Sequence, residues 1–309
     1  MQLEFQELAL IAERMEQGVV VCNNEGNIEY TNPFVSRFFA FNEGELLGKN
    51  VQDLSPNFTF NPKKMQQTKV LLPAISLKNK FGNTIHFNAT IIRAASEKRI
   101  IVMIEDVTSI IDANIGLINK INTIEKLTKS RFIRDGQLTK AIQEILFESA
   151  HALNVERVNA WIVDKDFTMI ESIGNYTKST NSFEDKTILL RKDMPAYFKL
   201  LATQEIIATN YSLEDPRTEE LVAPYLSLYG ITSMIDIPIR VGGEMIGVVC
   251  FEHLGAPRKW DLTERKFGFF VAQLIAQSLQ SNENQKYKQH LEVLLKEKED
   301  LLKELGKKN

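Results

Sequence analysis

The last part of the chain places the strongest constraint on the fold. Between Phe269 and Leu305 there is neither proline nor glycine, so this segment can form one continuous helix. Apolar residues recur along it with the four-three spacing of a coiled coil, while Glu and Lys occupy the other faces. A narrow apolar stripe of this kind is buried by a second helix. We therefore expect residues 282–309 to form a coiled-coil helix, and the chain to be a homodimer.

The predicted dimer seam draws on two helices. A second helical pattern begins after Asp106 and carries an equally narrow stripe. A neighbouring stripe of Ile111, Ile115 and Ile118 leaves open the alternative that this helix packs on its own domain. The predicted seam consists of Ile110, Leu117, Ile121 and Ile124 in the first helix and of Tyr287, Leu291, Leu294, Leu301 and Leu305 in the second.

Composition and charge exclude several classes of protein. The 309 residues allow two or three domains, and 44% hydrophobic with 25% charged residues is typical of folded globular proteins. Because the 37 Lys and Arg residues are nearly balanced by 40 Asp and Glu residues, no basic surface for nucleic acid is expected. Cys22 and Cys250 stand far apart in apolar runs, which excludes a disulfide framework or a paired-cysteine metal site. These features favour the cytoplasm.

Neither a signal peptide nor a membrane span is expected. Residues 1–17 have the pattern of an amphipathic helix, and Glu4, Glu7 and Glu13 interrupt what a secretory signal would keep apolar. No stretch reaches the roughly 18 apolar residues that a span requires. Even the most apolar run is broken, by Asp236 among others.

The first half of the chain has the pattern of a small antiparallel sheet. Two short strands at 18–22 and 28–30 flank a polar turn, and Asn32 is placed to cap a helix that begins at the next residue. Alternating apolar residues then predict strands at 85–91 and 100–104. The expected order is two strands, short helices, and two or three further strands.

The second half mixes helices and strands in another order. The sequence predicts a helix from Leu138 to Leu153, strands at 158–163 and 167–173, a helix from Pro195, a strand at 205–208, a helix at 218–229, and a hairpin of 234–239 with 245–251. Gly242 and Gly243 permit the positive φ of the hairpin turn. Asp261 and Glu264 form a capping box for the last helix. Its residues expected to face a core are Phe267, Phe270, Val271 and Leu274.

Several motifs in the first half resemble a PAS domain over about residues 8–108. They are the segment from Gly18 to Phe34, the Gly-Glu-Leu-Leu-Gly of 44–48, and the closing Asp-Val-Thr of 106–108. The resemblance implies a five-stranded antiparallel sheet wrapped on one side by short helices, often a sensor of a small molecule or of redox state.

Residues 131–282 resemble a GAF domain of the subgroup that precedes bacterial histidine kinases. Four blocks in order carry the resemblance, at 210–221, 230–239, 247–253 and 257–260. The tail at 296–305 is similar to the helix that leads into the phosphoacceptor region of such kinases, although the sequence ends at Asn309 before a phosphoacceptor histidine or an ATP-binding segment.

Together these patterns predict an α+β chain with two antiparallel-sheet sensor domains, a joining helix and a long C-terminal helix. The predicted divisions are an N-terminal helix at 1–17, a PAS-like domain at 18–108, a helical linker at 109–135, a GAF-like domain at 136–281 and the coiled-coil helix at 282–309.

Candidate site residues lie in turn-rich parts of the GAF-like segment. Asp215, Arg217, Glu252, His253 and Trp260 are candidates for a pocket rim. The alternative is structural: Asp215 and Arg217 pair to fix a loop, and Trp260 covers the edge of a core. No nucleophile, phosphate loop or metal-ligand set accompanies them, so no catalytic, cofactor or metal residue is assigned.

The other chemically active residues are expected to pack. Cys22 lies on a predicted strand as a small core residue, and Cys250 is expected to pack rather than to link a bilin. His86 falls on the opposite strand face from Ile85 and Phe87, which favours a surface or packing role over haem ligation. No cofactor can be named for either domain.

These features favour a cytoplasmic signal-sensing protein that has no chemistry of its own. A possible small-molecule ligand would shift the packing of the dimeric helices, and a downstream signalling protein would read that shift. Three alternatives stay open: the input half of a histidine kinase, a GAF enzyme such as a methionine-sulfoxide reductase, and a structural dimeriser without a ligand.

Overall fold

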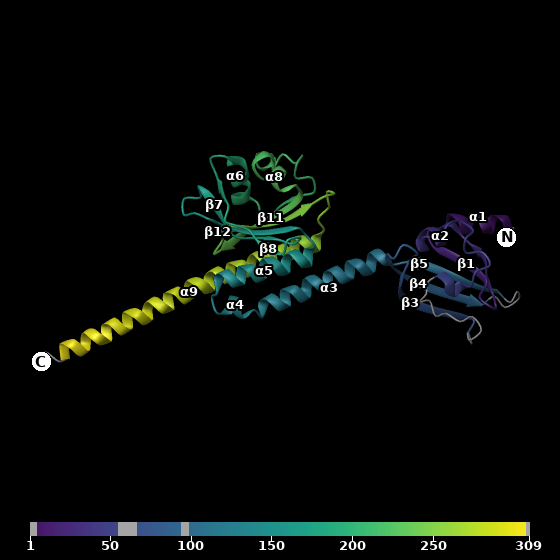
Figure 1. Ribbon diagram of the computed structural model, residues 1–309, viewed down its shortest axis with the longest axis horizontal. Coiled ribbons are helices and arrows are strands. Elements are labelled where there is room, and N and C mark those ends of the chain that lie inside the picture. The colour runs from purple at the N-terminus through teal and green to yellow at the C-terminus, as the bar shows by residue number, and fades with distance from the viewer. Residues whose placement is uncertain (1–4, 55–66, 94–98, 307–309) are drawn as a thin grey trace. The chain divides into compact units, whose positions relative to one another are not determined.

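The computed structural model describes residues 5–54, 67–93 and 99–306. The chain divides into two compact units, Met1–Ile115 and Gly116–Asn309. Each has its own sheet, with helices packed against it (Figure 1). Helix α3 (Thr108–Thr128) runs from the first unit into the second and supplies most of the predicted linker.

The first unit is built on a five-stranded antiparallel sheet with the order β2-β1-β5-β4-β3. Its strands are β1 (Gly18–Asn23), β2 (Ile28–Thr31), β3 (Lys69–Lys78), β4 (Thr84–Arg93) and β5 (Arg99–Asp106), and its helices are α1 (Phe5–Arg14), α2 (Pro33–Phe39) and the 3₁₀ turn η1 (Val51–Leu54). The sheet has the five strands that the resemblance implied.

Strand alternation puts the apolar residues of this sheet on one face. Phe87, Ala89 and Ile91 of β4 are fully buried there, beside the matching residues of β1 and β5. Helix α2 covers the face, and the Phe39 ring meets the Phe87 ring edge to face at 5.5 Å. Cys22 belongs to this core, as expected.

Asn32 begins helix α2, but its side chain does not cap it as predicted. The side-chain amide donates to the carbonyl oxygens of Ala12 and Gln17, both at 2.8 Å, and Oδ1 accepts the Val19 N–H at 3.0 Å. The side chain is drawn away because these peptide groups at the end of α1 and the start of β1 need partners. Pro33 loses nothing at the first helical position.

The second unit contains a seven-stranded antiparallel sheet with the order β10-β11-β12-β6-β7-β8, and β9 also pairs with β7. Its strands are β6 (Arg157–Val163), β7 (Met169–Thr177), β8 (Ser182–Phe183), β9 (Ile188–Leu190), β10 (Ile207–Thr209), β11 (Ile231–Val241) and β12 (Glu244–Leu254). Its other helices are α4 (Arg131–Arg134), α5 (Leu138–Leu153), α6 (Pro195–Thr203), α7 (Glu219–Leu221), the π-helical turn η3 (Val222–Leu226), α8 (Ser227–Tyr229) and α9 (Leu262–Gly306).

Both faces of this sheet are covered. Helices α5 and α9 lie on one face, while α6 and α8 lie on the other (Figure 1). Residues such as Ile235, Val249 and Phe251 point to the core between the sheet and helices α5 and α9. The alternate residues, among them Met234 and Cys250, point to the core on the opposite face, under α6, α7 and η3. The layer of α6, α7, η3 and α8 is called the helical cap below.

Two predictions about the second unit need correction. The segment 218–229 is not one regular helix, because Pro224 has no N–H for the helical ladder and the backbone widens there into the π-turn η3. Phe270 does not face the core: its side chain is 57% exposed, because α9 turns that position toward α3. The other three residues predicted to face a core, Phe267, Val271 and Leu274, are buried.

The start of α9 is confirmed in detail. The Glu264 N–H donates to Asp261 Oδ1 at 2.8 Å, and the Asp261 N–H donates to Glu264 Oε2 at 3.0 Å. These reciprocal bonds are the predicted capping box. From there α9 continues to Gly306 without a break. Within the described residues, no helix combines the length and apolar character needed to span a bilayer.

Candidate functional site

Three central strands of the second sheet carry a band of polar side chains beneath the helical cap. Asp236 of β11 pairs across the strands with Cys250 of β12, which pairs in turn with Asn159 of β6. One row along on the same face, Glu252 pairs with Arg157. All five side chains are buried. A polar band here is unusual, because the same face is otherwise lined by apolar core residues.

Asp236 is the least compensated of these groups. It has no exposed surface, and its carboxylate Oδ2 accepts a hydrogen bond of 2.7 Å from the Tyr197 hydroxyl of α6. Oδ1 accepts no hydrogen bond from a nitrogen or oxygen donor. Burial raises the pKa of Asp236 to about 7, although hydrogen bonds from the Cys250 thiol and Tyr197 oppose the rise; the nearby Glu252 adds to it.

Glu252 is better satisfied. Its Oε1 accepts a hydrogen bond of 2.8 Å from the Tyr225 hydroxyl, and its Oε2 accepts one of 3.1 Å from Arg157 Nε. Burial still raises the pKa of Glu252 above its ordinary value, against the effect of Arg157. Arg157 also donates to Glu184 at 2.6 Å, and its guanidinium lies 4.0 Å from the centre of the Tyr229 ring. The carboxylates hold the pKa of Arg157 high although burial alone would lower it.

A small cavity of about 10 Å³ lies between this band and the helical cap. It is lined by Trp161, Ile170, Leu189, Tyr197, Leu221, Tyr225, Met234, Cys250 and Glu252. A space of that size holds about one water molecule. The indole Nε1 of Trp161, on its wall, has no nitrogen or oxygen partner. Any larger ligand must displace part of the cap.

The cavity offers no nucleophile. Cys250 is buried, and burial, together with Asp236 and Glu252, raises the pKa of its thiol well above the ordinary value. The thiolate is the reactive form of cysteine, so this position disfavours attack on a substrate. The described residues also contain no cluster of three or more His, Cys, Asp or Glu side chains that could hold a metal ion.

Of the predicted pocket-rim residues, Glu252 alone lines this cavity. The side chains of Asp215 and Arg217 are joined by two hydrogen bonds of 2.9 and 2.6 Å, and Arg217 also donates to a backbone carbonyl. His253 Nε2 lies 3.1 Å from the Ala256 carbonyl. Trp260 is buried in the core on the other sheet face, where its Nε1 donates to the Thr209 carbonyl at 3.0 Å.

The sequence reasoning missed Asp236, Asn159, Tyr197 and Tyr225. A signal was available for Asp236, because a carboxylate in the run Met-Ile-Asp-Ile-Pro-Ile falls on one face of a buried strand. The two tyrosines come from the helical cap, and no spacing in the sequence relates them to the strands.

The first unit contains two further chemically active residues, Cys22 and His86. Cys22 is fully buried, and burial followed by the nearby Glu29 raises its pKa to about 11. His86 is nearly buried on the outer sheet face: its Nδ1 lies 2.7 Å from Ser76 Oγ, and its Nε2 lies 3.6 Å from Asp112 Oδ1 on α3. His86 therefore has a packing role, linking β4 to the start of α3.

The predicted seam residues of α3 line an apolar groove in the second unit. The groove has a volume of about 580 Å³ and runs between α3 and the start of α9. Leu117, Ile121 and Ile124 meet Phe267 and Phe270 there. Ile110, also predicted for the seam, is exposed in the part of α3 that belongs to the first unit.

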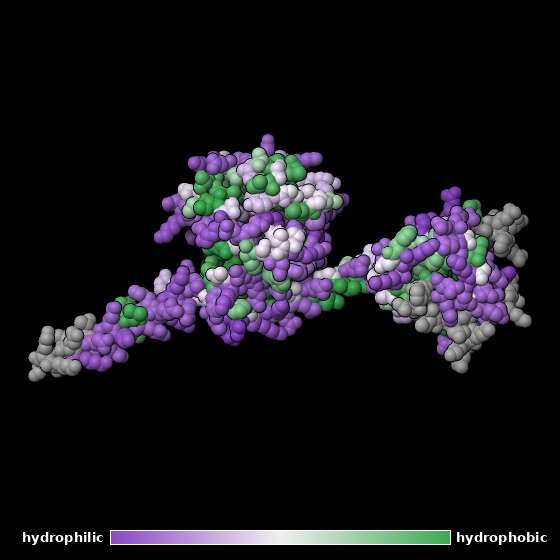
Figure 2. Space-filling view, in the orientation of Figure 1, coloured by the Kyte–Doolittle hydropathy of each residue, from purple (hydrophilic) through white to green (hydrophobic). Residues whose placement is uncertain are grey.

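The part of α9 beyond Glu283, called the rod below, carries a stripe of exposed apolar residues. Tyr287, Leu291 and Leu294 are 68%, 58% and 45% exposed, and apolar patches interrupt the hydrophilic surface of the rod in Figure 2. The side chains of Leu301 and Leu305, the remaining predicted seam residues, lie outside the described residues.

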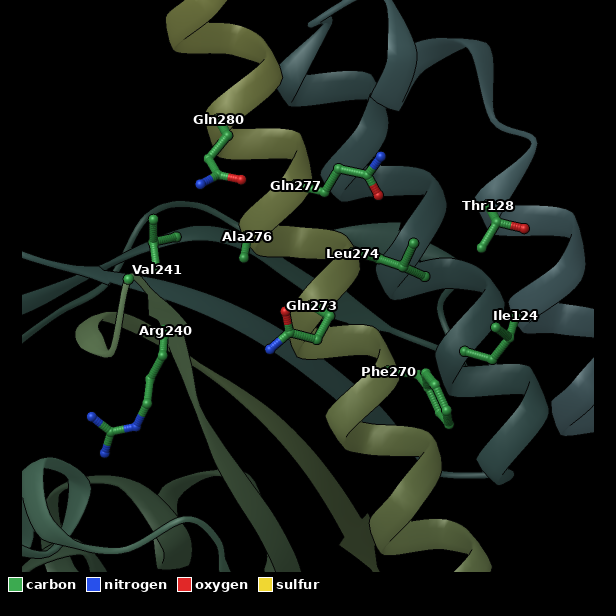
Figure 3. A pocket seen from close by; sticks show the side chains of 11 residues that line it. Ile124, Thr128, Arg240, Val241, Phe270, Gln273, Leu274, Ala276, Gln277 and Gln280 are labelled. Atoms are coloured by element: carbon green, nitrogen blue, oxygen red, sulfur yellow. The ribbon is translucent and has the colours of Figure 1, made fainter.

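A further hollow of about 420 Å³ lies where α3, α9 and the β11–β12 turn meet. Gln273, Gln277 and Gln280 line it from α9, and the Arg240 side chain points away from that helix (Figure 3). Arg240 is engaged elsewhere, since it donates to the carbonyl oxygens of Ala202 and Gln204. The charged group of Arg240 is therefore already bonded to backbone of its own domain.

Comparison with known families agrees with this architecture. A PAS domain model matches residues 16–109, and a GAF domain model matches residues 137–279. The chain contains a PAS domain followed by a GAF domain. The polar band and its cavity lie in the GAF domain, and the continuous helix α3 leads from the PAS domain into it.

Solved structures with similar folds include two phytochrome fragments. The photosensory core module of the Stigmatella aurantiaca phytochrome is 12% identical with a TM-score of 0.45; the match covers 90% of this chain and 59% of that one. The chromophore-binding domain of a bacteriophytochrome from R. palustris is 13% identical with a TM-score of 0.43, covering 87% and 94%.

A third similar structure is a GAF domain from Synechocystis in its photoproduct state. It is 18% identical with a TM-score of 0.40, and the match covers 48% of this chain and 98% of that one. No curated protein matches the sequence. The two matched domains are sensory modules, so the chain is a sensory signalling protein.

Proposed function

We propose that this chain is a cytoplasmic regulatory protein in which the PAS and GAF domains control the packing of a dimeric output helix. The observation that carries the proposal is the exposed apolar stripe of α9. Tyr287, Leu291 and Leu294 keep the four-three spacing, and beyond about residue 283 every side chain of this helix that the structure describes is exposed. A second copy of the chain would bury this stripe.

The groove between α3 and α9 supports the same arrangement. Its exposed Ile121 and Phe270 extend the apolar surface from the rod to the helix that enters the GAF domain. A helix that is continuous from the PAS domain into this groove can transmit a change in packing. A ligand shifts such an equilibrium only by its differential affinity for the two arrangements.

The output is proposed to be a protein–protein contact. The charged outer faces of α9 would be read by a downstream signalling protein, or would continue into the catalytic half of a histidine kinase. Neither form requires chemistry in this chain. The buried thiol of Cys250, with its raised pKa, supports the absence of sulfoxide reduction. Turnover of methionine sulfoxide that Cys250→Ser abolishes would contradict this proposal.

Introducing charged residues into the apolar stripe of α9 tests whether that stripe forms the dimer interface. We expect light scattering to give a dimer mass for the full chain and a monomer mass for the double variant Leu291→Asp, Leu294→Asp. Two buried carboxylates facing two others would repel and lose hydration. Val293→Asp is the matched control, because Val293 is 54% exposed on the same helix but lies off the stripe.

Two results would contradict the dimer. One is a monomeric full chain at cellular concentrations, which would leave the stripe without its proposed partner. The other is a dimer whose mass is unchanged in the double variant, which would place the interface elsewhere. Circular dichroism at the same concentrations should show that the control variant keeps the helix content of the unmodified chain.

A further inference from the structure

The cavity under the helical cap contains more acid than its surroundings neutralise. Asp236 and Glu252 are both buried, from neighbouring strands. The cation in contact with this pair is Arg157, whose guanidinium is divided between Glu252 and Glu184. Within the part of the chain that the structure describes, no Lys, Arg or His side chain forms an ion pair with Asp236.

Unused hydrogen-bonding capacity gathers at the same place. Asp236 Oδ1 and Trp161 Nε1 belong to side chains that are at least nine-tenths buried, and neither atom has a nitrogen or oxygen partner. Trp161 lines the cavity directly. Asp236 is not itself a lining residue, but it is bonded to Tyr197 and pairs across the strands with Cys250, which both line the cavity. The Cys250 thiol is the weak partner of both side chains. A buried carboxylate oxygen that accepts from no nitrogen or oxygen donor is rare in native proteins and calls for an explanation.

The remaining walls are aromatic and apolar. Trp161, Tyr197 and Tyr225 line the cavity from β6, α6 and η3, and the Trp161 and Tyr225 rings meet nearly edge to face at 6.1 Å. Aromatic rings attract cations through the negative potential of their faces, most strongly where water is excluded. Carboxylates among aromatic rings are therefore the chemistry that recognises an organic cation.

We propose that this cavity binds a small protonated amine, whose N–H groups bond to the Asp236 carboxylate and whose alkyl part contacts Trp161 and Tyr225. An anion would meet two carboxylates with one shared cation, and a neutral molecule would leave Asp236 without a counter-charge. The inference rests on the proposed sensory role of the GAF domain and adds the class of ligand.

Binding of the amine would also move the cap. The cavity of about 10 Å³ is too small for any organic molecule, so a wall must yield. The Tyr197 hydroxyl ties α6 to the sheet through its 2.7 Å hydrogen bond to Asp236. An amine that replaces this hydroxyl on Asp236 frees α6 from that attachment. The ligand thus has the differential contact with two cap positions that a sensor requires.

Protons should compete with the amine for Asp236. The titratable groups facing this carboxyl are Tyr197 from α6 and Cys250 and Glu252 from β12, and none of them is a cation. With a pKa of about 7, Asp236 is largely protonated below neutrality and must release its proton to bind a cation. The affinity for an amine should therefore rise about tenfold per pH unit below that pKa and level off above it.

The experiment uses the full chain with ¹⁵N-labelled tryptophan and methylammonium chloride as the probe. The chain has two tryptophans, so its indole spectrum contains one reporter in the cavity and one control. Trp260 serves as the control, because its Nε1 is bonded to Thr209 in the opposite core. We expect methylammonium to shift the Trp161 indole signal in a saturable way and to leave the Trp260 signal in place. Methanol and sodium acetate should shift neither.

Two variants sharpen the test. Asp236→Asn should abolish the methylammonium shift, with the unchanged Trp260 signal showing that the domain is folded, whereas Asp215→Asn should bind like the unmodified chain. Tyr197→Phe removes the hydroxyl that competes with the amine for the Asp236 carboxylate, so this variant should bind methylammonium several-fold more tightly.

Three results would overturn the inference: no saturable Trp161 shift at pH 8 at any concentration that keeps the fold, equal shifts with methanol, or unchanged binding by Asp236→Asn. The dimer mass does not depend on this cavity, so a failed amine test with an intact dimer would reject the ligand class and leave the proposed function standing.

Discussion

At the scale of single residues, burial and hydrogen bonding give several side chains properties that their identity alone does not imply. Asp236 is an acid with a pKa of about 7, because the sheet and helical cap remove it from water and provide no cation. Asp215, an acid of the same type, has its pKa lowered by a hydrogen bond from Arg217 at the surface. The same functional group is thus largely neutral at one position and charged at the other near pH 6.

The first prediction concerns the pH dependence of stability. A carboxyl whose folded pKa is raised contributes stability that is complete below its unfolded pKa, near 4, and is lost as the pH rises through about 7. Asp236→Asn removes this loss, which amounts to about 1.4 kcal/mol per pH unit between the two pKa values. The variant should therefore melt higher than the unmodified chain at pH 8, with a smaller difference at pH 5.

Tryptophan fluorescence can follow this melting, because both tryptophans lie in the GAF domain. Asp215→Asn is the control, and its effect should be the opposite. Because the pKa of Asp215 is lowered in the folded state, its charged carboxylate stabilises the fold above the pKa that Asp215 has when unfolded, so Asp215→Asn should lower the melting temperature at pH 8. If Asp236→Asn raised the melting temperature equally at pH 5 and pH 8, that result would contradict a pKa near 7 for Asp236.

The second prediction concerns Asn32 in the PAS domain. The three hydrogen bonds of its side chain tie the end of α1 to the start of β1. Each contributes about 1 kcal/mol, so Asn32→Ala should lower the free energy of unfolding of this region by about 2–4 kcal/mol. Faster hydrogen exchange of the β1 amides would report the loss. Asn88→Ala, which removes exposed hydrogen bonds, should leave β1 unchanged. Unaltered β1 exchange in Asn32→Ala would show that these bonds add nothing.

At the scale of secondary-structure elements, close packing of backbone against backbone fixes how the central strands of the GAF domain meet. A Cβ placed at Gly247 of β12 would lie 2.2 Å from the backbone oxygen of Trp161 in β6. A Cβ at Gly174 of β7 would instead meet the side-chain methyl groups of Ile142 and Leu146, both at 2.8 Å. Backbone atoms in a sheet cannot shift alone, whereas the tips of side chains can.

The third prediction follows from this difference. Gly247→Ala should lower the melting temperature of the GAF domain more than Gly174→Ala, because the first forces two paired strands apart and the second repacks two side chains. Overpacking typically costs about 1–3 kcal/mol, and we expect Gly247→Ala at or above the upper end. Thermal melts followed by tryptophan fluorescence compare the two. Equal losses would mean that strands β6 and β12 separate as easily as side chains rearrange.

At the scale of the whole molecule, α9 has two parts with different sources of stability. Up to about Leu279 it buries Phe267, Val271 and Ile275 in the GAF core. Beyond Glu283, every residue whose side chain the structure describes is exposed. Because most helical stability in proteins comes from packing of an apolar face, the proposed second copy would supply the packing that this part lacks.

The fourth prediction tests that dependence by hydrogen exchange. If the full chain forms the proposed dimer, we expect slow exchange along both parts of α9. In the double variant Leu291→Asp, Leu294→Asp, residues 284–306 should exchange much faster, while residues 262–280 keep their protection because their core is intact. Val293→Asp should resemble the unmodified chain. Protection of 284–306 that survives in the double variant would show that this helix is stable without a second copy.

The sequence determined by itself those features that depend on local patterns. The succession of strands and short helices along the PAS segment, the hairpin at Gly242 and Gly243, the capping box of α9 and its unbroken course all follow from residues close together in the chain. Turn chemistry, capping and apolar periodicity act over a few residues, so they can be interpreted without the fold.

The tertiary structure decided the features that bring distant residues together. It placed Asp236, Cys250 and Asn159 in one row and set Tyr197 and Tyr225 above them, although these residues come from five separate elements. It also turned Phe270 outward and drew the Asn32 side chain to α1. A pKa, an unpaired polar atom or a cavity depends on neighbours in space, and strand register and helix packing alone fix which neighbours those are.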